Sequence, residues 1–166
     1  MSRAAPGHCK RLGREFAMQF LYQRELSAEW SAPDALTHFW EQLRDSAEIP
    51  ENRDFRRAQR YAEKLIAGVD AVREELDQRI VRHAAPAWPL NRMAAVDRNL
   101  LRVAIYEMLH CPEVPPVVSI NEAVEIAKEF GGDESSAFIN GILNSVMAEV
   151  GRPARVPLRP AAESGQ

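Results

Sequence analysis

The chain has few cysteines and no long apolar run. Cys9 and Cys111 are the only cysteines among 166 residues, so no disulfide framework of the kind found in small secreted domains is predicted. The uninterrupted apolar stretches are only a few residues long, too short for a membrane-spanning helix. Residues 1–12 contain three cations and lack the apolar centre of a secretory signal peptide. These absences predict a cytosolic, and hence cytoplasmic, protein with free thiols.

Sequence motifs of catalysis and metal binding are also missing. The chain contains no Gly-x-Ser-x-Gly, no Walker lysine loop and no Gly-x-Gly-x-x-Gly. The pairs His8-Cys9 and His110-Cys111 lack the spacing of a zinc finger. We therefore predict no enzymatic activity, no cofactor and no metal.

The net charge of −3 is distributed unevenly. Residues 1–14 hold four cations and no acid, and residues 152–166 hold three arginines and one glutamate, which leaves −9 on residues 15–151. An acidic body with basic ends is a pattern of chains that bind polyanions through their termini. Charge that merely keeps flexible ends soluble explains the same pattern, and the composition leaves both readings open.

The apolar residues predict a helical core. They make up 46% of the sequence, enough for a chain of this length to bury roughly 70% of the surface exposed when unfolded. Apolar residues recur every three or four positions in most segments, and no strand-like alternation is found. The prediction is an all-α fold of about seven helices in two small abutting bundles. The expected helices include residues 14–26, a helix from about 33, helices from about 54 to 83 and about 95 to 110, and one over 119–130. A last helix is expected to begin after a cap at Asp133 or Ser135 and to end at Val150.

The predicted boundaries follow from proline, glycine and capping residues. We expect residues 1–13 to form a flexible basic arm, 14–84 an N-terminal bundle, 85–151 a C-terminal bundle and 152–166 a disordered tail. Ser119 with Glu122 has the spacing of a capping box, in which the hydroxyl and the carboxylate bind opposite backbone amides. Gly131 stands where a left-handed residue commonly closes a helix, and Asp133 or Ser135 can cap the next one.

A polar corner, "KEFGGDESSAFING" at residues 128–141, interrupts these helices. Turn and capping chemistry accounts for most of its residues. It leaves unexplained why the last helix begins with polar residues. Exposed backbone amides at a helix start, with Ser135 and Ser136 beside them, suit contact with phosphate or sugar.

Three segments resemble the signature blocks of the NusB family of bacterial transcription antitermination factors. They are "REFAMQFLYQRE" (14–25), "VDRNLLRVAIYEML" (96–109) and "SINEAVEIAKEFGGDESSAFINGIL" (119–143). Their order and spacing agree with the family over roughly residues 10–150. The resemblance implies an all-helical protein that binds the single-stranded boxA segment of ribosomal RNA leader transcripts together with NusE, a small-subunit ribosomal protein. The pair then joins other Nus factors on RNA polymerase to suppress premature termination.

The resemblance also implies which residues contact RNA and NusE. The RNA-facing positions fall on Lys10, Arg11, Arg14, Gln19, Arg102, Glu134, Ser135, Ser136 and Phe138, and the NusE-facing positions on Tyr22 and Asp97. Exposure to solvent accounts for Gln19 equally well, and packing in the core accounts for Phe138. Arg102 suits either the RNA-facing or the NusE-facing surface. For these positions to act together, the basic N-terminus must lie beside the corner and form one cradle for RNA.

The sequence departs from the family pattern at two places in these surfaces. Leu12 and Gly13 interrupt what is often a denser run of arginines, and Ala137 stands where a lysine is common. Both changes predict weak RNA binding by the chain alone, strengthened by NusE.

A further group of cations lies at helical spacing outside the family pattern. They are Arg53, Arg56, Arg57, Arg60 and Lys64. Because Asp54 and Glu63 are interleaved with them, a solvated outer face is the favoured reading.

Two other functional readings remain open. Similar helical domains precede the catalytic domain of some RNA cytosine methyltransferases, although 166 residues leave no room for a cofactor-binding α/β domain. Alternatively, the chain is a protein-only adaptor that uses Tyr22 and Asp97 and never touches RNA. Self-association as a homodimer through exposed helix faces is also left open.

Overall fold

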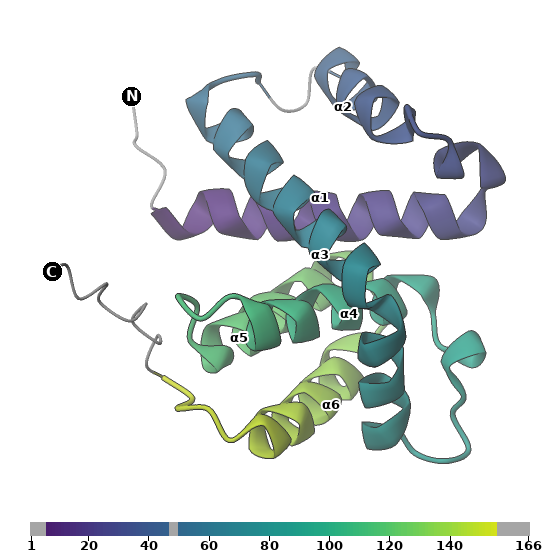
Figure 1. Ribbon diagram of the computed structural model, residues 1–166, viewed down its shortest axis with the longest axis vertical. Coiled ribbons are helices and arrows are strands. Elements are labelled where there is room, and N and C mark those ends of the chain that lie inside the picture. The colour runs from purple at the N-terminus through teal and green to yellow at the C-terminus, as the bar shows by residue number, and fades with distance from the viewer. Residues whose placement is uncertain (1–5, 47–49, 156–166) are drawn as a thin grey trace, which may run out of the picture. The chain divides into compact units, whose positions relative to one another are not determined.

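A computed structural model describes residues 6–46 and 50–155, and these residues are helical almost throughout (Figure 1). They form six α-helices and two 3₁₀ helices, so the expected count of about seven α-helices is not confirmed. The elements are α1 (Pro6–Leu26), η1 (Ala28–Ser31), α2 (Ala35–Asp45), α3 (Arg53–His83), η2 (Leu90–Arg92), α4 (Ala95–His110), α5 (Pro116–Phe130) and α6 (Ser135–Val150).

The chain divides into two compact units, Met1–Asp70 and Ala71–Gln166, and the division falls inside α3. Near the division, Val72 leaves the helical conformation with φ −127° and ψ 23°. The boundary expected from the sequence lies later, after residue 84. The second half of α3 belongs to the second unit because it is tied there by polar contacts, such as that between Asp77 and Arg102.

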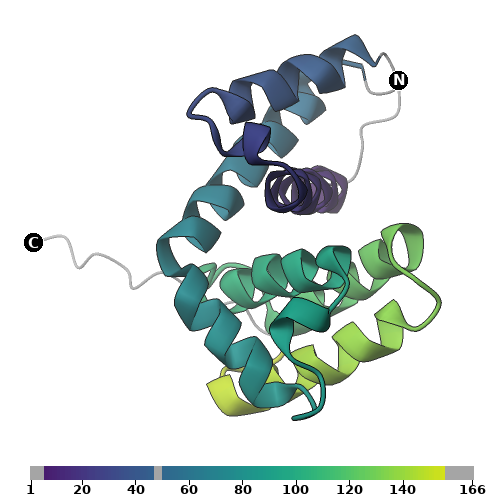
Figure 2. The same cartoon turned by 90° about the vertical axis from the view of Figure 1, so that its right-hand side faces the viewer.

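The core of the first unit is aromatic. Phe16 of α1 lies 5.6 Å from both Trp40 of α2 and Phe55 of α3, measured between ring centroids. Phe39 packs on Trp40 at 5.0 Å and on Phe20 at 5.5 Å. All five rings are buried, so this cluster holds the three helices together. Figure 2 looks nearly along α1, with α2 and the first half of α3 around it.

The expectation of an irregular arm over residues 1–13 is wrong for residues 6–13, which form the first turns of α1. Residues 1–5 lie outside the described part. The helix extends this far because its start packs on α3. Cys9 is buried with its Sγ 3.6 Å from Asp54 Oδ1. A Cβ on Gly13 would lie 2.9 Å from the carbonyl oxygen of Ala58, so only glycine permits this approach.

In the second unit, α4, α5 and α6 pack against one another. The fully buried Glu107 of α4 accepts a hydrogen bond of 2.5 Å from the Ser119 hydroxyl of α5. The capping box predicted for Ser119 and Glu122 is therefore wrong. The helix begins earlier, at Pro116, a residue suited to a first turn because it lacks an amide hydrogen.

The two glycines that follow α5 and α6 end their helices differently. Gly151 is left-handed (φ 66°) and closes α6. Gly131 is extended (φ −94°, ψ −178°), so the left-handed closure predicted there is wrong. Glycine is required at position 131 for a steric reason, because a Cβ there would lie 2.6 Å from the Cβ of Ser135.

The C-terminal tail is ordered at its beginning. Arg152 donates to the carbonyl oxygens of Met108, Pro112 and Val114 at 2.6–2.9 Å, and the Ala154 carbonyl accepts from the Val117 amide. The prediction of a disordered tail is therefore wrong for residues 152–155, and residues 156–166 lie outside the described part. No helix in the described ranges is long and apolar enough to cross a membrane.

Candidate nucleic-acid and partner interface

A groove of about 820 Å³ opens in the second unit where the corner meets the loop before α4. It brings together four residues predicted from sequence and several that were not. The predicted ones are Asp97, Glu134, Ser135 and Phe138, and the others include Trp88, Arg92 and Asp133. The groove therefore joins positions implied for RNA with one implied for NusE. Ser136, the remaining corner position, is half-buried and is not among the lining residues.

Ser135 organises one wall of this groove. Its side chain is buried, and its Oγ accepts a hydrogen bond from the Gly132 amide at 3.0 Å. The hydroxyl also bonds to the carboxylate of Asp97 on α4. Ser135 therefore links the corner to the start of α4. It does not cap α6, where Glu134 occupies the cap position without a side-chain hydrogen bond.

Asp97 is the buried acid of the groove. Its side chain is only 8% exposed, and within the described part of the chain its Oδ1 atom has no hydrogen-bond partner. Burial raises the pKa of the carboxyl above its ordinary value, and the bond from Ser135 offsets part of that rise. A buried acceptor without a partner costs stability, so it is suited to a donor brought by a ligand.

Replacing Asp97 with asparagine should favour folding increasingly as the pH rises. When folding raises the pKa of a carboxyl, that group stabilises the folded state at pH values below its pKa in the unfolded chain. This stabilisation is lost as the pH rises through the pKa of the folded state. Asparagine keeps the acceptor for Ser135 but has no charge to desolvate. Urea unfolding of both proteins at several pH values from 5 to 8 measures the difference. A wild type that gains stability relative to Asp97→Asn with rising pH would contradict this account.

The groove combines aromatic surface with acidic charge. Trp88 is 51% exposed and Phe138 is half-buried. Asp97, Asp133 and Glu134 outnumber Arg92, so the charged lining is net negative when all are ionised. Such a site disfavours phosphate and suits stacking of a flat group together with acceptance from N–H donors. The described residues contain no cluster of three or more His, Cys, Asp or Glu side chains that could hold a metal ion.

The predicted residues of α1 lie in the first unit and differ in how accessible they are. Lys10, Arg11, Gln19 and Tyr22 are half-buried. Arg14 is only 4% exposed and lies 5.7 Å from the ring centroid of Tyr61. Its guanidinium is packed on α3, and its role as a phosphate contact stays a prediction. Lys10 packs on the same ring at 5.4 Å while remaining partly open.

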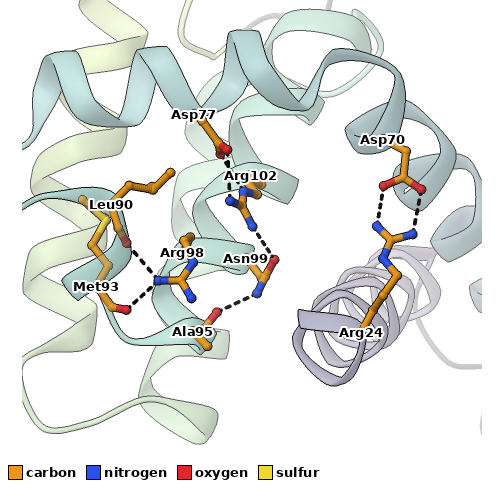
Figure 3. A network of polar contacts seen from close by, with 9 residues as sticks. All are labelled: Arg24, Asp70, Asp77, Leu90, Met93, Ala95, Arg98, Asn99 and Arg102. Carbon is orange, nitrogen blue, oxygen red and sulfur yellow. Dashed lines mark hydrogen bonds and ion pairs between the residues drawn. The ribbon is translucent and has the colours of Figure 1, made fainter. Parts of the chain in front are cut away.

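Arg102, which was predicted to contact RNA, is engaged with partners inside the second unit, so its contact with RNA stays a prediction (Figure 3). Its side chain is 4% exposed, and it donates to both carboxylate oxygens of Asp77, at 2.6 and 3.1 Å. A third bond, 3.0 Å long, reaches Asn99, whose amide donates to the Ala95 carbonyl. The guanidinium therefore ties the second half of α3 to α4.

Trp88 and Arg92 were not predicted from the sequence. They stand in a proline-containing segment without helical periodicity, so no pattern assigned them a face. A weak signal was available, because tryptophan is enriched at interfaces and Trp88 stands in a loop rather than in a helical apolar pattern. Arg98, nearby on α4, holds this segment by donating to the carbonyl oxygens of Leu90 and Met93 at 2.9 and 2.8 Å (Figure 3).

Known proteins resemble this chain over most of its length. A sequence model of the NusB family matches residues 11–148. A transcription antitermination protein NusB of Myxococcus xanthus is 44% identical over 144 residues, which cover 87% of this chain and 98% of that protein.

Two solved structures share its fold. A NusB structure from T. maritima has a TM-score of 0.69 and 32% identity, and the match covers 87% of this chain and 92% of that one. A chain from a crystal structure of antitermination factors NusB and NusE in complex with double-stranded RNA has a TM-score of 0.68. It is 24% identical, with coverage of 86% and 98%, and so supports the fold alone.

The helical fold, the match over residues 11–148 and the relatives of similar length agree with the resemblance of the three sequence blocks. This chain belongs to the NusB family.

Proposed function

We propose that this chain is an RNA-binding transcription antitermination factor that binds boxA RNA together with NusE. One observation carries the proposal. The groove of the second unit gathers Glu134, Ser135 and Phe138, implied for RNA, beside Asp97, implied for NusE. Through this pair of partners the chain would join other Nus factors on RNA polymerase and help it avoid premature termination.

The groove would take an unpaired base rather than a phosphate. Phe138 and the exposed Trp88 offer ring faces for stacking, which is the usual way proteins hold splayed-out RNA bases. Glu134 is exposed and can accept from a base amino group, so it would select among bases rather than add affinity. Phosphate contact would come from Lys10 and Arg11 at the start of α1. That these cations lie beside the corner and form one cradle with it stays a prediction.

Asp97 and Tyr22 would contact NusE. The carboxylate of Asp97 is nine-tenths buried, so only a group that enters the groove can reach its Oδ1 atom. An N–H donor from NusE would satisfy that oxygen. Because this contact would lie in the groove that also takes RNA, NusE would strengthen RNA binding there. Under this proposal the protein acts in the cytoplasm by binding alone and catalyses no reaction.

Removing the cations of Lys10 and Arg11 should weaken RNA binding and leave NusE binding intact. Each phosphate neutralised on a single strand contributes about 0.7 to the magnitude of the slope of log affinity against log salt. The double variant Lys10→Ala/Arg11→Ala should therefore reduce that slope by about 1.4. Titration of labelled boxA RNA at several salt concentrations, with and without NusE, measures it.

The matched control removes two exposed arginines outside the proposed interface, Arg44→Ala/Arg73→Ala. It changes the net charge equally and should leave the slope nearly unchanged. If the Lys10/Arg11 variant binds RNA as tightly as the wild type at every salt concentration, the basic start of α1 is not part of the interface. A wild type that binds NusE but no RNA would favour the protein-only adaptor.

A further inference from the structure

The first half of α3 carries a row of cations on its outer surface. Arg53, Arg57, Arg60 and Lys64 follow one another at spacings of four, three and four, which places them on one stripe of a helix, with Arg56 at its edge. All five side chains are exposed, whereas Phe55, Ala58 and Ala62 are buried on the opposite side. We call these five cations the α3 arginine face. At 1.5 Å per residue it is about 17 Å long, enough to meet more than one phosphate.

The acids interleaved with this face in sequence flank it in the structure. Asp54 is engaged with the buried Cys9 of α1, its Oδ1 lying 3.6 Å from the Sγ atom. Glu63 accepts from Gln59 and lines a separate groove of about 350 Å³ with residues of α1 and α2. Among residues 6–46 and 50–155, none of the ion pairs involves Arg53, Arg56, Arg57 or Arg60. The reading as a neutralised, solvated face therefore loses its main support.

The α3 arginine face continues into the basic start of α1. Tyr61, one turn after Arg57, carries both Lys10 and Arg14 over its ring, at 5.4 and 5.7 Å. The two helices approach closely enough there that Gly13 has no room for a Cβ beside Ala58. The charge of Arg57 also reaches Cys9, where it lowers the thiol pKa against the larger effect of burial, which raises it. These contacts place the half-buried Lys10 beside the α3 arginine face, whereas Arg14 is buried between the two helices.

The sequence concentrates charge on this surface. Residues 1–70 hold eleven cations and eleven acids, yet eight of those cations fall within residues 10–14 and 53–64, which contain only two acids. All of the eight except the buried Arg14 are exposed or half-buried. The surface also lacks an apolar anchor, because the large exposed apolar side chains of the described chain, Leu26, Val81, Trp88 and Val118, all lie elsewhere. A protein interface usually needs such an anchor, whereas a phosphate backbone needs only positive charge.

We propose that the α3 arginine face binds backbone phosphates of RNA that extends beyond the segment held at the start of α1. The inference rests on the proposed RNA-binding function and deepens it. Guanidinium groups bind phosphate oxygens in pairs, and they do so independently of base identity. The face therefore adds affinity and salt dependence for longer RNA without adding sequence preference.

The experiment compares short and extended RNA on the full chain with NusE present. The variant Arg57→Gln/Arg60→Gln removes two charges from the centre of the face, and Arg44→Gln/Arg73→Gln removes two exposed charges elsewhere as the control. Each protein is titrated with boxA RNA alone and with boxA RNA carrying unstructured single-stranded extensions on both sides. Far-ultraviolet circular dichroism melts verify that both variants fold, as expected for exposed positions.

The expected result separates the two RNAs. Arg57→Gln/Arg60→Gln should bind boxA alone as the wild type does, but it should bind extended RNA more weakly, with a salt slope reduced in magnitude by about 1.4. The control should match the wild type on both. Unchanged affinity and slope for extended RNA would overturn the inference while leaving the proposed function intact. A wild type that fails to bind boxA at all would overturn both. Polyglutamate serves as a probe for acidic proteins. If Arg57→Gln/Arg60→Gln loses binding to polyglutamate while its RNA binding is unchanged, the inference is overturned and the face is assigned to an acidic protein.

Discussion

Asp77→Ala should lower the free energy of unfolding by more than the value of about 0–1 kcal/mol for a surface pair and by at most about 3–5 kcal/mol, the cost for a fully buried ion pair, because Asp77 is 23% exposed. Arg102 is only 4% exposed, and Asp77 receives two of its hydrogen bonds (Figure 3). Without the carboxylate, the buried guanidinium loses two charge-assisted hydrogen bonds. Chemical denaturation followed by circular dichroism measures the loss.

The matched control is Asp70→Ala, which breaks a second aspartate–arginine pair with Arg24. That pair is also bonded through both oxygens, with one bond of 2.9 Å between Arg24 Nη1 and Asp70 Oδ2, but its side chains are 23% and 41% exposed. Solvent screening limits such a pair to about 0–1 kcal/mol. Equal losses in the two variants would show that burial of Arg102 does not govern the stability of the second unit.

Gly13→Ala should destabilise the protein relative to Gly141→Ala by about 1–3 kcal/mol, the typical cost of overfilling a packed site. Both glycines lie inside α-helices, so both alanine variants gain up to about 1 kcal/mol of helix propensity. Only at Gly13 does the new Cβ meet the protein, at 2.9 Å from the Ala58 carbonyl oxygen and 3.0 Å from the Tyr61 ring. The Cβ at Gly141 meets nothing within 4 Å.

Thermal or urea unfolding of the two alanine variants isolates the cost of the close helix contact, because their propensity gains cancel. Gly141→Ala should be more stable than the wild type. If Gly13→Ala is stabilised by the same amount, α1 and α3 do not approach as closely as described. The start of α1 would then be free to behave as the flexible arm that the sequence suggested.

Several positions show why sequence reasoning succeeded for the fold and only partly for the site. Apolar spacing located the helices that became α3, α4 and α6, because a helix must bury one face whatever its partner is. The same spacing could not show that Arg14 and Arg102 are buried, since a cation on a polar stripe looks alike whether it faces solvent, an aromatic ring or a carboxylate. The start of α1 was not predicted because its residues are largely polar and show no helical apolar spacing. The helix is stabilised there by packing on α3.

The amino-acid sequence by itself determined the all-helical class, the family and the identity of the polar corner, because these depend on residue type and local spacing. Only the tertiary structure decided which polar residues share a site. Asp97 and Ser135 are 38 positions apart in sequence, yet helix packing joins them by a hydrogen bond, and Trp88 reaches their groove from a loop with no periodic pattern. Asp54 and Glu63 take partners outside the α3 arginine face, and the sequence could not show this, because the neighbours of a side chain depend on how the helices pack.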